Sequence, residues 1–316
     1  MTEGRKMFLS VMAVFLAYAV IFILFEDYDR TFLSAFNEPS DWHLLIFSLI
    51  VMGGLGWLLN RYAHRMDERI SREQAAKENE MRRQLTHNIA HELKTPVASI
   101  LGYTETLLDH PELDEPTRRQ FTQRTHSQAQ RLTALLQDIS TLNRMDYAPD
   151  QLAKERIDVS QIMSEIAQET ALTLSRHHIT LRNCLPEDIS IMGNASLVYS
   201  IFRNLADNAV NYAGEGATIE ITAEERETEW LFNFSDNGPG IASEHLPRIF
   251  ERFYRIDKGR SRSLGGTGLG LAIVKNAVVL HGGTITAQNI APHGLRFSFT
   301  LKKQASPQPA QNSARP

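Results

Sequence analysis

The chain has 316 residues, 42% of them hydrophobic, and a formal net charge of −4 at pH 7. This length and apolar content allow two or three compact folded units, and the small negative charge gives no electrostatic case for nucleic-acid binding. The single cysteine, Cys184, excludes an internal disulfide framework, zinc fingers and CxxC redox chemistry, and its leucine neighbours predict a buried structural thiol.

Two apolar segments lie near the start of the chain. Residues 7–25 carry no charged side chain, and residues 42–59 carry none apart from His43. With a rise of about 1.5 Å per helical residue, each segment can cross a hydrocarbon layer of about 30 Å. We therefore predict two transmembrane helices, at 7–25 and 42–59, in contact with membrane lipid. A secretory signal peptide is the alternative for the first segment.

Charged residues around these segments predict their orientation. Arg5 and Lys6 precede the first segment and basic residues follow the second from Arg61 on, whereas the charged residues of the loop at 26–41 are all acidic apart from Arg30. The positive-inside rule places residues 1–6 and the C-terminal part of the chain in the cytoplasm, with the loop on the other side. The loop is too short to fold as a domain of its own.

The following region is predicted to be helical. Charged residues crowd 60–80, which we predict to be a signalling helix linker that runs directly into the next segment. Over 81–146, apolar residues recur at steps of three and four along two helices, separated by a turn with prolines at both ends. Such a hairpin leaves an apolar face exposed, and pairing two hairpins into a four-helix bundle buries it. We therefore predict a dimerisation hairpin at 81–146 and a homodimer.

Beyond this hairpin, helices and strands mix. The predicted domain at 147–302 has mostly antiparallel strands and segregated helices, which favours an α+β layer sandwich. The predicted helices are 160–176 (with Ser160 as N-cap), 194–212 and 269–280, and the predicted strands are 179–184, 189–191, 218–223, 229–235, 284–289 and 295–301. Residues 303–316 lack periodicity and are predicted to form a disordered tail.

Five short blocks carry the chemistry of the chain. They are HELKTP at 91–96 (the H block), NLADNAVNY at 204–212 (the N block), DNGPG at 236–240 (the first glycine block), FERFY at 250–254 (the F block) and GTGLG at 266–270 (the second glycine block). In this order they resemble a membrane-bound bacterial two-component sensor histidine kinase, with a HisKA-type dimerisation domain and a GHKL-type ATPase domain. The resemblance runs over residues 81–301 and implies a location in the bacterial inner membrane.

His91 is the expected phosphate acceptor. Near pH 7 a histidine is largely neutral, so one ring nitrogen has a lone pair that can attack the γ-phosphorus of ATP. Thr95 lies at i+4 on the same helix face, where its hydroxyl can position a hydrolytic water, and Pro96 predicts a bend. Glu92 points about 100° away from its neighbour His91. The resemblance implies that Glu92 acts as a base or imidazole orienter and that Thr95 supports phosphatase action.

The expected ATP site differs from other phosphate-binding motifs. No P-loop occurs, and GTGLG lacks the third glycine of a dinucleotide fingerprint. Closely spaced glycines let backbone N–H groups approach phosphates at a helix start. The acceptor-only carboxylate of Asp236 suits the N6 amine of adenine and favours ATP over GTP, with Gly238 and Gly240 supplying the turn that exposes it. An ordinary hairpin turn is the alternative for this block.

The resemblance implies the remaining roles. Asn208 coordinates Mg²⁺ through its amide oxygen, Asn204 meets the glutamate beside the phosphate-accepting histidine, and Tyr212 packs near the nucleotide. Asn211 stands where many relatives have lysine, and nearby arginines are expected to supply compensating charge, a solvated basic loop being the alternative. The complete expected sets are His91, Glu92, Thr95 and Asn204 for catalysis, and Asn208, Asn211, Tyr212, Asp236, Gly238, Gly240, Arg252, Arg255, Gly266, Thr267, Gly268, Leu269 and Gly270 for ATP and Mg²⁺.

Together these features predict an ATP:protein-histidine phosphotransferase. It passes phosphate from His91 to an aspartate of a response-regulator receiver domain, and it also dephosphorylates that regulator. The first alternative is a phosphatase-dominant or scaffold signalling protein whose kinase site is weakened by Asn211. An ATP-driven clamp, such as a topoisomerase or chaperone, shares the nucleotide fold but requires neither HELKTP nor two membrane spans.

Overall fold

The computed structural model of the protein describes residues 39–147, 153–257 and 266–303, and the chain divides into two compact units at 1–86 and 87–316. The predicted first span at 7–25 and the predicted tail beyond Lys303 lie outside the described residues. Within the described part of the chain, no helix is long and apolar enough to cross a membrane.

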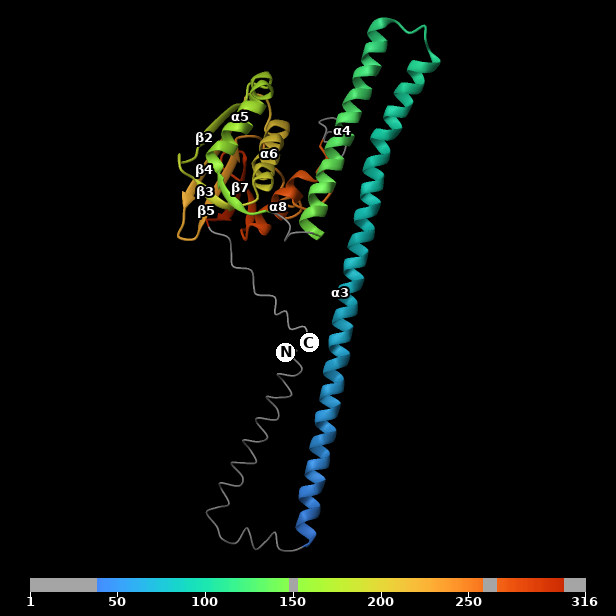
Figure 1. The fold of residues 1–316 in the computed structure, drawn as a ribbon, viewed down its shortest axis with the longest axis vertical. Helices are drawn as coiled ribbons and strands as arrows, with labels where there is room; N and C mark the ends of the chain where they lie inside the picture. Colours follow the sequence, from blue (N-terminus) through green and yellow to red (C-terminus); the bar gives the residue numbers. More distant parts are fainter. Residues whose placement is uncertain (1–38, 148–152, 258–265, 304–316) are drawn as a thin grey trace. The chain divides into compact units, whose positions relative to one another are not determined.

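A long helix and its shorter partner form the hairpin. α3 (Pro39–Asp109) runs through the predicted second span, the linker and the first helix of the hairpin, and it continues through Pro96 without ending there. α4 (Glu115–Tyr147) follows after a short turn (Figure 1). Near the turn, Arg118 Nη2 donates to the carbonyl of Pro111 (2.8 Å), and the rings of Tyr103 and Phe121 lie 5.7 Å apart. The predicted helical hairpin is confirmed.

A five-stranded sheet forms the core of the C-terminal lobe, residues 153–303, with the strand order β2-β4-β5-β7-β6. Its strands are β2 (Thr180–Cys184), β4 (Thr218–Glu225), β5 (Glu229–Asp236), β6 (Ile285–Asn289) and β7 (Leu295–Lys302). All neighbours pair antiparallel except β2 and β4, which are parallel. Every second side chain of β5 and β7 is buried, so Phe232 and Phe299 stack with ring centroids 5.3 Å apart.

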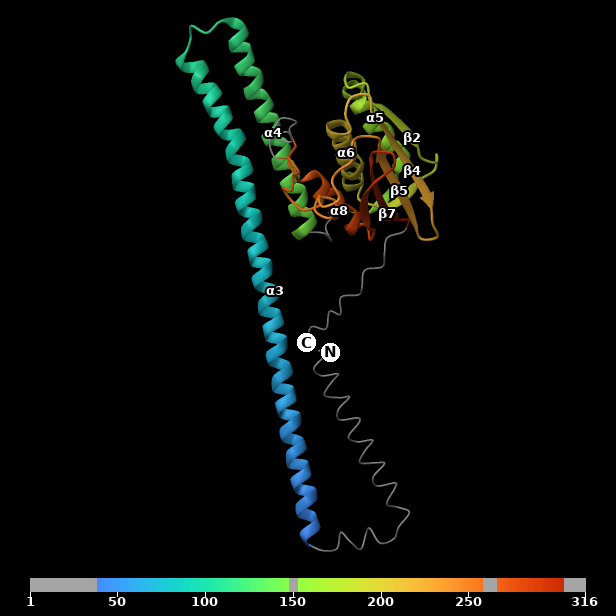
Figure 2. The same ribbon diagram turned by 180° about the vertical axis from the view of Figure 1, so that it is seen from behind.

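Three helices cover one face of this sheet: α5 (Val159–Arg176), α6 (Ala195–Tyr212) and α8 (Gly270–Leu280) (Figures 1 and 2). Phe202 of α6 makes edge-to-face contacts with Phe232 (5.5 Å) and Phe299 (5.6 Å), which ties the helical layer to the sheet. The predicted α+β layer sandwich is confirmed.

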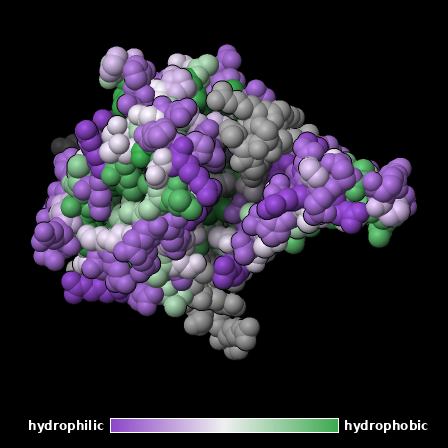
Figure 3. All heavy atoms as spheres, turned by 90° about the horizontal axis from the view of Figure 1, so that it is seen from above, coloured by the Kyte–Doolittle hydropathy of each residue, from purple (hydrophilic) through white to green (hydrophobic). Residues whose placement is uncertain are grey.

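The face of the protein in Figure 3 is largely hydrophilic, with hydrophobic residues in separate small groups.

Three details differ from the predictions. Asp158, rather than Ser160, caps α5, because its Oδ1 accepts from the backbone N–H groups of Ser160 (2.9 Å) and Gln161 (3.1 Å). An unpredicted strand, β1 (Glu155–Asp158), pairs antiparallel with β3 (Ser190–Gly193). Cys184 is exposed rather than buried, because β2 lies at the edge of the sheet and most of its side chains face solvent.

Candidate functional site

The H block presents its histidine to solvent. The His91 side chain is 60% exposed, and the hydroxyl of Thr95, one turn further along α3, donates to the His91 carbonyl (3.4 Å). Pro96 is buried within the same turn. The imidazole is therefore accessible to a reacting phosphorus atom, and His91 and Thr95 share a helix face as predicted.

Glu92 is held between the histidine and two arginines. Its Oε1 lies 3.8 Å from His91 Nδ1, while its Oε2 lies 3.0 Å from Arg255 Nη2 and 3.5 Å from Arg131 Nη2. All three partners of this ion cluster are desolvated, with side-chain exposures of 12% for Glu92, 5% for Arg255 and 10% for Arg131. Glu92 is thus within reach of His91, but its carboxylate is shared with a guanidinium from the C-terminal lobe.

Two further contacts join the hairpin to the rim of the lobe. Thr267 of the second glycine block donates to Asp138 Oδ2 of α4 (2.7 Å), and Arg252 of the F block donates to Asp146 Oδ1 (2.8 Å). Burial raises the pKa of Asp138, and the hydrogen bond from Thr267 opposes that shift. Apolar packing accompanies these bonds, because the buried Leu142 of α4 belongs to the same core cluster as residues of α8.

The N block lies on α6, which begins after its cap Asn194. Asn204 Nδ2 donates to the Ser200 carbonyl (2.7 Å), and a Cβ atom added to Gly270 would lie 2.5 Å from Asn204 Oδ1. Asn204 therefore packs directly against the start of α8. The structure brings the N block and the second glycine block together, as the site requires. Asn208 and Asn211 are partly exposed on the same helix, and Tyr212 is exposed.

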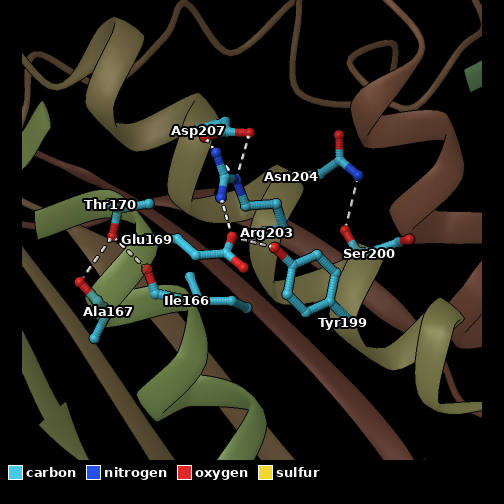
Figure 4. Close-up of polar contacts among 9 residues, drawn as sticks. All are labelled: Ile166, Ala167, Glu169, Thr170, Tyr199, Ser200, Arg203, Asn204 and Asp207. Atoms are coloured by element: carbon cyan, nitrogen blue, oxygen red, sulfur yellow. Dashed lines mark hydrogen bonds and ion pairs between the residues drawn. The ribbon is translucent and has the colours of Figure 1, made fainter. Parts of the chain in front are cut away.

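A polar network fixes α6 against α5 next to these asparagines. In Figure 4, Arg203 lies between Glu169 of α5 and Asp207 of α6. Its Nη1 donates to Glu169 Oε2 (2.7 Å) and its Nε to Asp207 Oδ2 (3.0 Å), and the Tyr199 hydroxyl donates to the same Glu169 oxygen. Arg203 directly precedes Asn204, so the network holds the helix turn that carries the N block.

Asp236 ends β5 as a buried carboxylate. Its Oδ1 accepts from the Gly238 backbone N–H (2.9 Å). Burial raises its pKa, and the backbone N–H groups of Gly238 and Leu295 oppose the shift. A Cβ on Gly238 would lie 2.6 Å from Ala213 Cα, so only glycine fits there. Gly240 has φ +70°, and Asn289 fixes the following residue by bonding both the N–H (3.0 Å) and the carbonyl (2.7 Å) of Ile241.

The F block and the second glycine block are bonded to each other. Phe253 adopts a left-handed backbone (φ +63°), and its N–H donates to the Gly268 carbonyl (2.8 Å), where Gly268 also has a positive φ (+74°). The Thr267 hydroxyl accepts from the Leu269 N–H (3.2 Å) just before α8 begins at Gly270. Gly266 opens this described segment, and residues 258–265 lie outside the description.

Two known domain families match the hairpin and the C-terminal lobe, respectively. Residues 81–148 match the His Kinase A (phospho-acceptor) domain, and residues 193–305 match the histidine kinase-, DNA gyrase B- and HSP90-like ATPase. The chain belongs to the two-component sensor histidine kinases. The first match contains the H block, and the second contains the N, F and glycine blocks.

Curated sensor kinases resemble this chain over about seven tenths of its length. It is 33% identical to the sensor histidine kinase WalK of Bacillus subtilis over 71% of this chain and 37% of WalK. It is 34% identical to the phosphate regulon sensor protein PhoR of Haemophilus influenzae over 71% of this chain and 52% of PhoR. The chain therefore spans about half or less of the length of these relatives.

Solved kinase structures share the fold. The Acinetobacter baumannii histidine kinase AdeS has a TM-score of 0.56 at 24% identity, over 67% of this chain and 98% of that one. The structure of full-length ShkA in complex with AMPPNP has a TM-score of 0.51 at 26% identity, over 68% of this chain and 45% of that one. A structure of ThkA in complex with the response regulator TrrA has a TM-score of 0.56 at 23% identity, over 73% and 64% of the two chains.

Several residues of this histidine kinase site were not predicted from the sequence. Arg131, Asp138 and Asp146 of α4 bond with Glu92, Thr267 and Arg252, respectively. One signal was available: Arg131 falls within the apolar stripe of its helix, where a charged residue needs a partner. Asn289 gave no comparable signal, because its partner is 48 residues away in the sequence.

Proposed function

We propose that this kinase transfers the γ-phosphoryl group of ATP to His91 and then to an aspartate of a response-regulator receiver domain. One observation carries the proposal: an exposed imidazole lies next to a largely desolvated carboxylate, and that carboxylate is bonded to an arginine at the rim of the ATPase lobe. Membership of the histidine kinase family and the likeness to the ThkA structure solved with its response regulator support it.

The chemistry assigned to the H block follows from its geometry. Glu92 lies on the Nδ1 side of the imidazole, so Nε2 is the nitrogen whose lone pair is free to attack. Attack at the γ-phosphorus forms the N–P bond and breaks the bond to the ADP oxygen. Such a transfer depends mainly on positioning and on stabilising the moving charge. Glu92 then acts by accepting or orienting the Nδ1 proton.

The nucleotide site is assigned to the N block and the two glycine blocks. Asp236 accepts the adenine N6 amine, and Arg252, Arg255 and the rim residues 266–270 face the phosphates. The histidine kinase ATPase family and the AMPPNP complex of ShkA support ATP as the nucleotide. Within the described ranges, no group of three or more His, Cys, Asp or Glu side chains could hold a metal ion. The Asn208 amide oxygen fits Mg²⁺, which typically uses few protein ligands together with substrate phosphates.

The hairpin is assigned to a homodimer. Val97, Leu101, Leu108 and Leu136 are large apolar side chains that are 48%, 56%, 79% and 51% exposed. The three residues of α3 lie within one narrow arc of the helix, because they are separated by four and seven positions. A second copy of the hairpin would cover this arc in a four-helix bundle. We also assign the protein to the bacterial inner membrane with both termini cytoplasmic, from its two apolar segments, which carry no charged side chain apart from His43, and from the basic residues that flank them.

Labelling with ATP tests the proposed reaction. The full chain should incorporate γ-phosphate from labelled ATP in an acid-labile, alkali-stable form, and His91→Gln should abolish the label. His87→Gln is the matched control, because His87 is an exposed histidine one turn earlier on the same helix. Label that persists in His91→Gln, or that disappears equally in His87→Gln, would refute the assignment.

A phosphatase-dominant kinase is the second candidate. Asn211 contributes no positive charge to the nucleotide site, and Glu92 is already bonded to two arginines. Both features disfavour the forward reaction without affecting Thr95. This candidate predicts rapid dephosphorylation of a phosphorylated receiver domain by a chain that labels only weakly with ATP.

A further inference from the structure

Three carboxylates of the hairpin bind the rim of the ATPase lobe. Glu92, Asp138 and Asp146, here called the acidic triad, bond to Arg255 (3.0 Å), Thr267 (2.7 Å) and Arg252 (2.8 Å), respectively. None of these three bonds is local in sequence, since the partners are 106 to 163 residues apart. The triad is therefore a property of the folded arrangement and not of any one segment.

The three rim groups are the ones that a triphosphate needs. In the proposed function Arg252, Arg255 and Thr267 face the phosphates of ATP, and this inference rests on that assignment. Carboxylate and phosphate oxygens are both anionic acceptors for guanidinium and hydroxyl donors. In this structure the triad occupies those donors in the same way that phosphate oxygens would.

Arg255 shows why the occupancy matters. Its side chain is only 5% exposed, and its Nε has no hydrogen-bond partner among the described residues. A Cβ on Gly268 would lie 3.1 Å from that Nε, so the guanidinium lies against the second glycine block. A desolvated cation is costly unless an anion compensates its charge, and Glu92 provides that charge here. Arg255 can leave Glu92 only if another anion takes the place of the Glu92 carboxylate.

Asp138 adds a repulsive element. Its carboxylate is bonded to Thr267 within the second glycine block and lies near Asp207 of the N block. A triphosphate bound at that rim would bring further negative charge next to Asp138, and like charges at close range repel one another. A bound triphosphate would thus draw Arg252 and Arg255 away from their carboxylates and would also repel Asp138. Both effects oppose docking of the hairpin on the rim.

We propose that the acidic triad competes with the triphosphate of ATP for Arg252, Arg255 and Thr267, so that docking of the hairpin on the rim and nucleotide binding oppose each other. A ligand that binds only the undocked lobe has an apparent affinity reduced by the docked fraction. By reciprocity, ATP shifts the lobe away from the triad. Arg255 then releases Glu92 only when nucleotide is present. Glu92 can therefore act on the His91 imidazole only when ATP is bound.

Neutralising the triad outside the H block tests the competition. Asp138→Asn and Asp146→Asn keep an oxygen acceptor and remove the charge. In the full chain, each should tighten binding of AMPPNP by about 3- to 10-fold, the range expected for the loss of one hydrogen bond or one part-exposed ion pair. Binding of AMP, which lacks the β- and γ-phosphates, should stay the same. Asp109→Asn, an exposed acid on the same hairpin, is the matched control and should leave both affinities unchanged.

The outcomes separate this inference from the proposed function. If AMPPNP binds equally well to the wild type and to both variants, or more weakly to the variants, the competition is refuted while ATP binding stands. Equal tightening for AMP and AMPPNP would also refute it, because the phosphates would then play no part. If no variant and no wild-type chain binds AMPPNP, the proposed function fails as well. Asp138→Glu restores the charge and should return wild-type affinity, which distinguishes competition from a misfolded Asn variant.

Discussion

The contact between Gly193 and His281 predicts a sharp loss of stability on a small substitution. A Cβ added to Gly193, at the end of β3, would lie 2.3 Å from both Cδ2 and Nε2 of the His281 ring. His281 Nδ1 faces the Ala277 carbonyl (2.7 Å), and Nε2 accepts from the Asn194 backbone N–H (3.0 Å). The ring is thus held as a neutral tautomer with its proton on Nδ1. Asn194 in turn caps α6, the helix that carries the N block.

Gly193→Ala should therefore destabilise the C-terminal lobe by about 1–5 kcal/mol. Displacing the ring leaves the Asn194 N–H without its acceptor, which costs about 1–3 kcal/mol, and overpacking costs about as much again. The gain from replacing a strand glycine recovers only about 0.5–1 kcal/mol. Hydrogen exchange of α6 peptides is the suitable assay, because a chain with two units need not unfold in one step.

Gly102→Ala is the matched control for this experiment. A Cβ at Gly102 would meet nothing within 4 Å in the interior of α3. That substitution should stabilise its helix by about 0.5–1 kcal/mol. Unchanged protection of α6 in Gly193→Ala would show that the ring shifts without losing its bond, and the reasoning would be wrong.

The same contact predicts a pH dependence. Burial lowers the pKa of His281, with a smaller contribution from Lys154, while the Ala277 carbonyl opposes the shift. The folded lobe therefore prefers the neutral ring. Its contribution to stability is complete above the ordinary histidine pKa of about 6.5, and it is lost as the pH falls from there through the lowered pKa. In Gly193→Ala, where the ring has already lost its bond, protection of α6 should fall less steeply over this range.

Three further substitutions test the site. Thr95→Ala should lower the rate at which a phosphorylated receiver domain is dephosphorylated by at least about 10-fold, and it should leave autophosphorylation unchanged. Thr95→Ser keeps the hydroxyl and should retain both activities. Equal phosphatase rates in the wild type and the two variants would exclude a role of Thr95 in dephosphorylation. Asp236→Asn keeps the acceptor for Gly238 N–H but turns a donor toward adenine, so the Kd for ATP should rise about 10- to 100-fold in a binding titration. Asn211→Lys should raise the autophosphorylation rate several-fold, on the order of 3- to 10-fold, by adding a cation at the phosphates; an identical rate would show that the arginines of the F block suffice.

Much of the fold follows from periodicity alone. The alternation of Trp230, Phe232 and Phe234 identifies β5, because a strand with one buried face repeats every two residues. The helices α4, α5 and α6 carry their apolar residues at steps of three and four, and the predicted ends of α5 and α6 agree with the structure to within one residue. β1 escaped prediction because only Ile157 of its four residues is buried, so the segment shows no apolar alternation.

Two of the errors have identifiable physical causes. Cys184 was predicted to be buried from its leucine neighbours, but burial in a sheet depends on whether another strand or layer covers the residue. The cap of α5 was placed two residues late, because serine and aspartate are nearly equivalent caps and only the backbone decides between them. The first error concerns tertiary placement and the second the local backbone conformation, and residue type alone determines neither.

The candidate site likewise contains residues that local sequence predicts and residues that it does not. The blocks that hold Asp236, Asn204 and Gly270 were predictable because each has a recognisable local sequence, and the close packing of Asn204 on Gly270 follows once both blocks are present. The partners of Glu92 were not predictable. Arg255 is 163 residues away from it, and a carboxylate adjacent to a reactive histidine gives no indication of which cation neutralises it.

The different environments of Glu92 and Thr95 have a consequence for regulation. Both belong to the same turn of α3 as His91, yet Glu92 bonds to the lobe through Arg255, whereas the Thr95 hydroxyl bonds only within its own helix among the contacts described. Any motion that carries Arg255 away changes the charge around Glu92 and leaves Thr95 where it is. In the proposed function, Glu92 serves the kinase step and Thr95 the phosphatase step, so movement of the lobe would alter the first without a compensating change in the second. One helix turn can thus serve two opposed reactions, because only one of its two functional side chains is coupled to the position of the ATPase lobe.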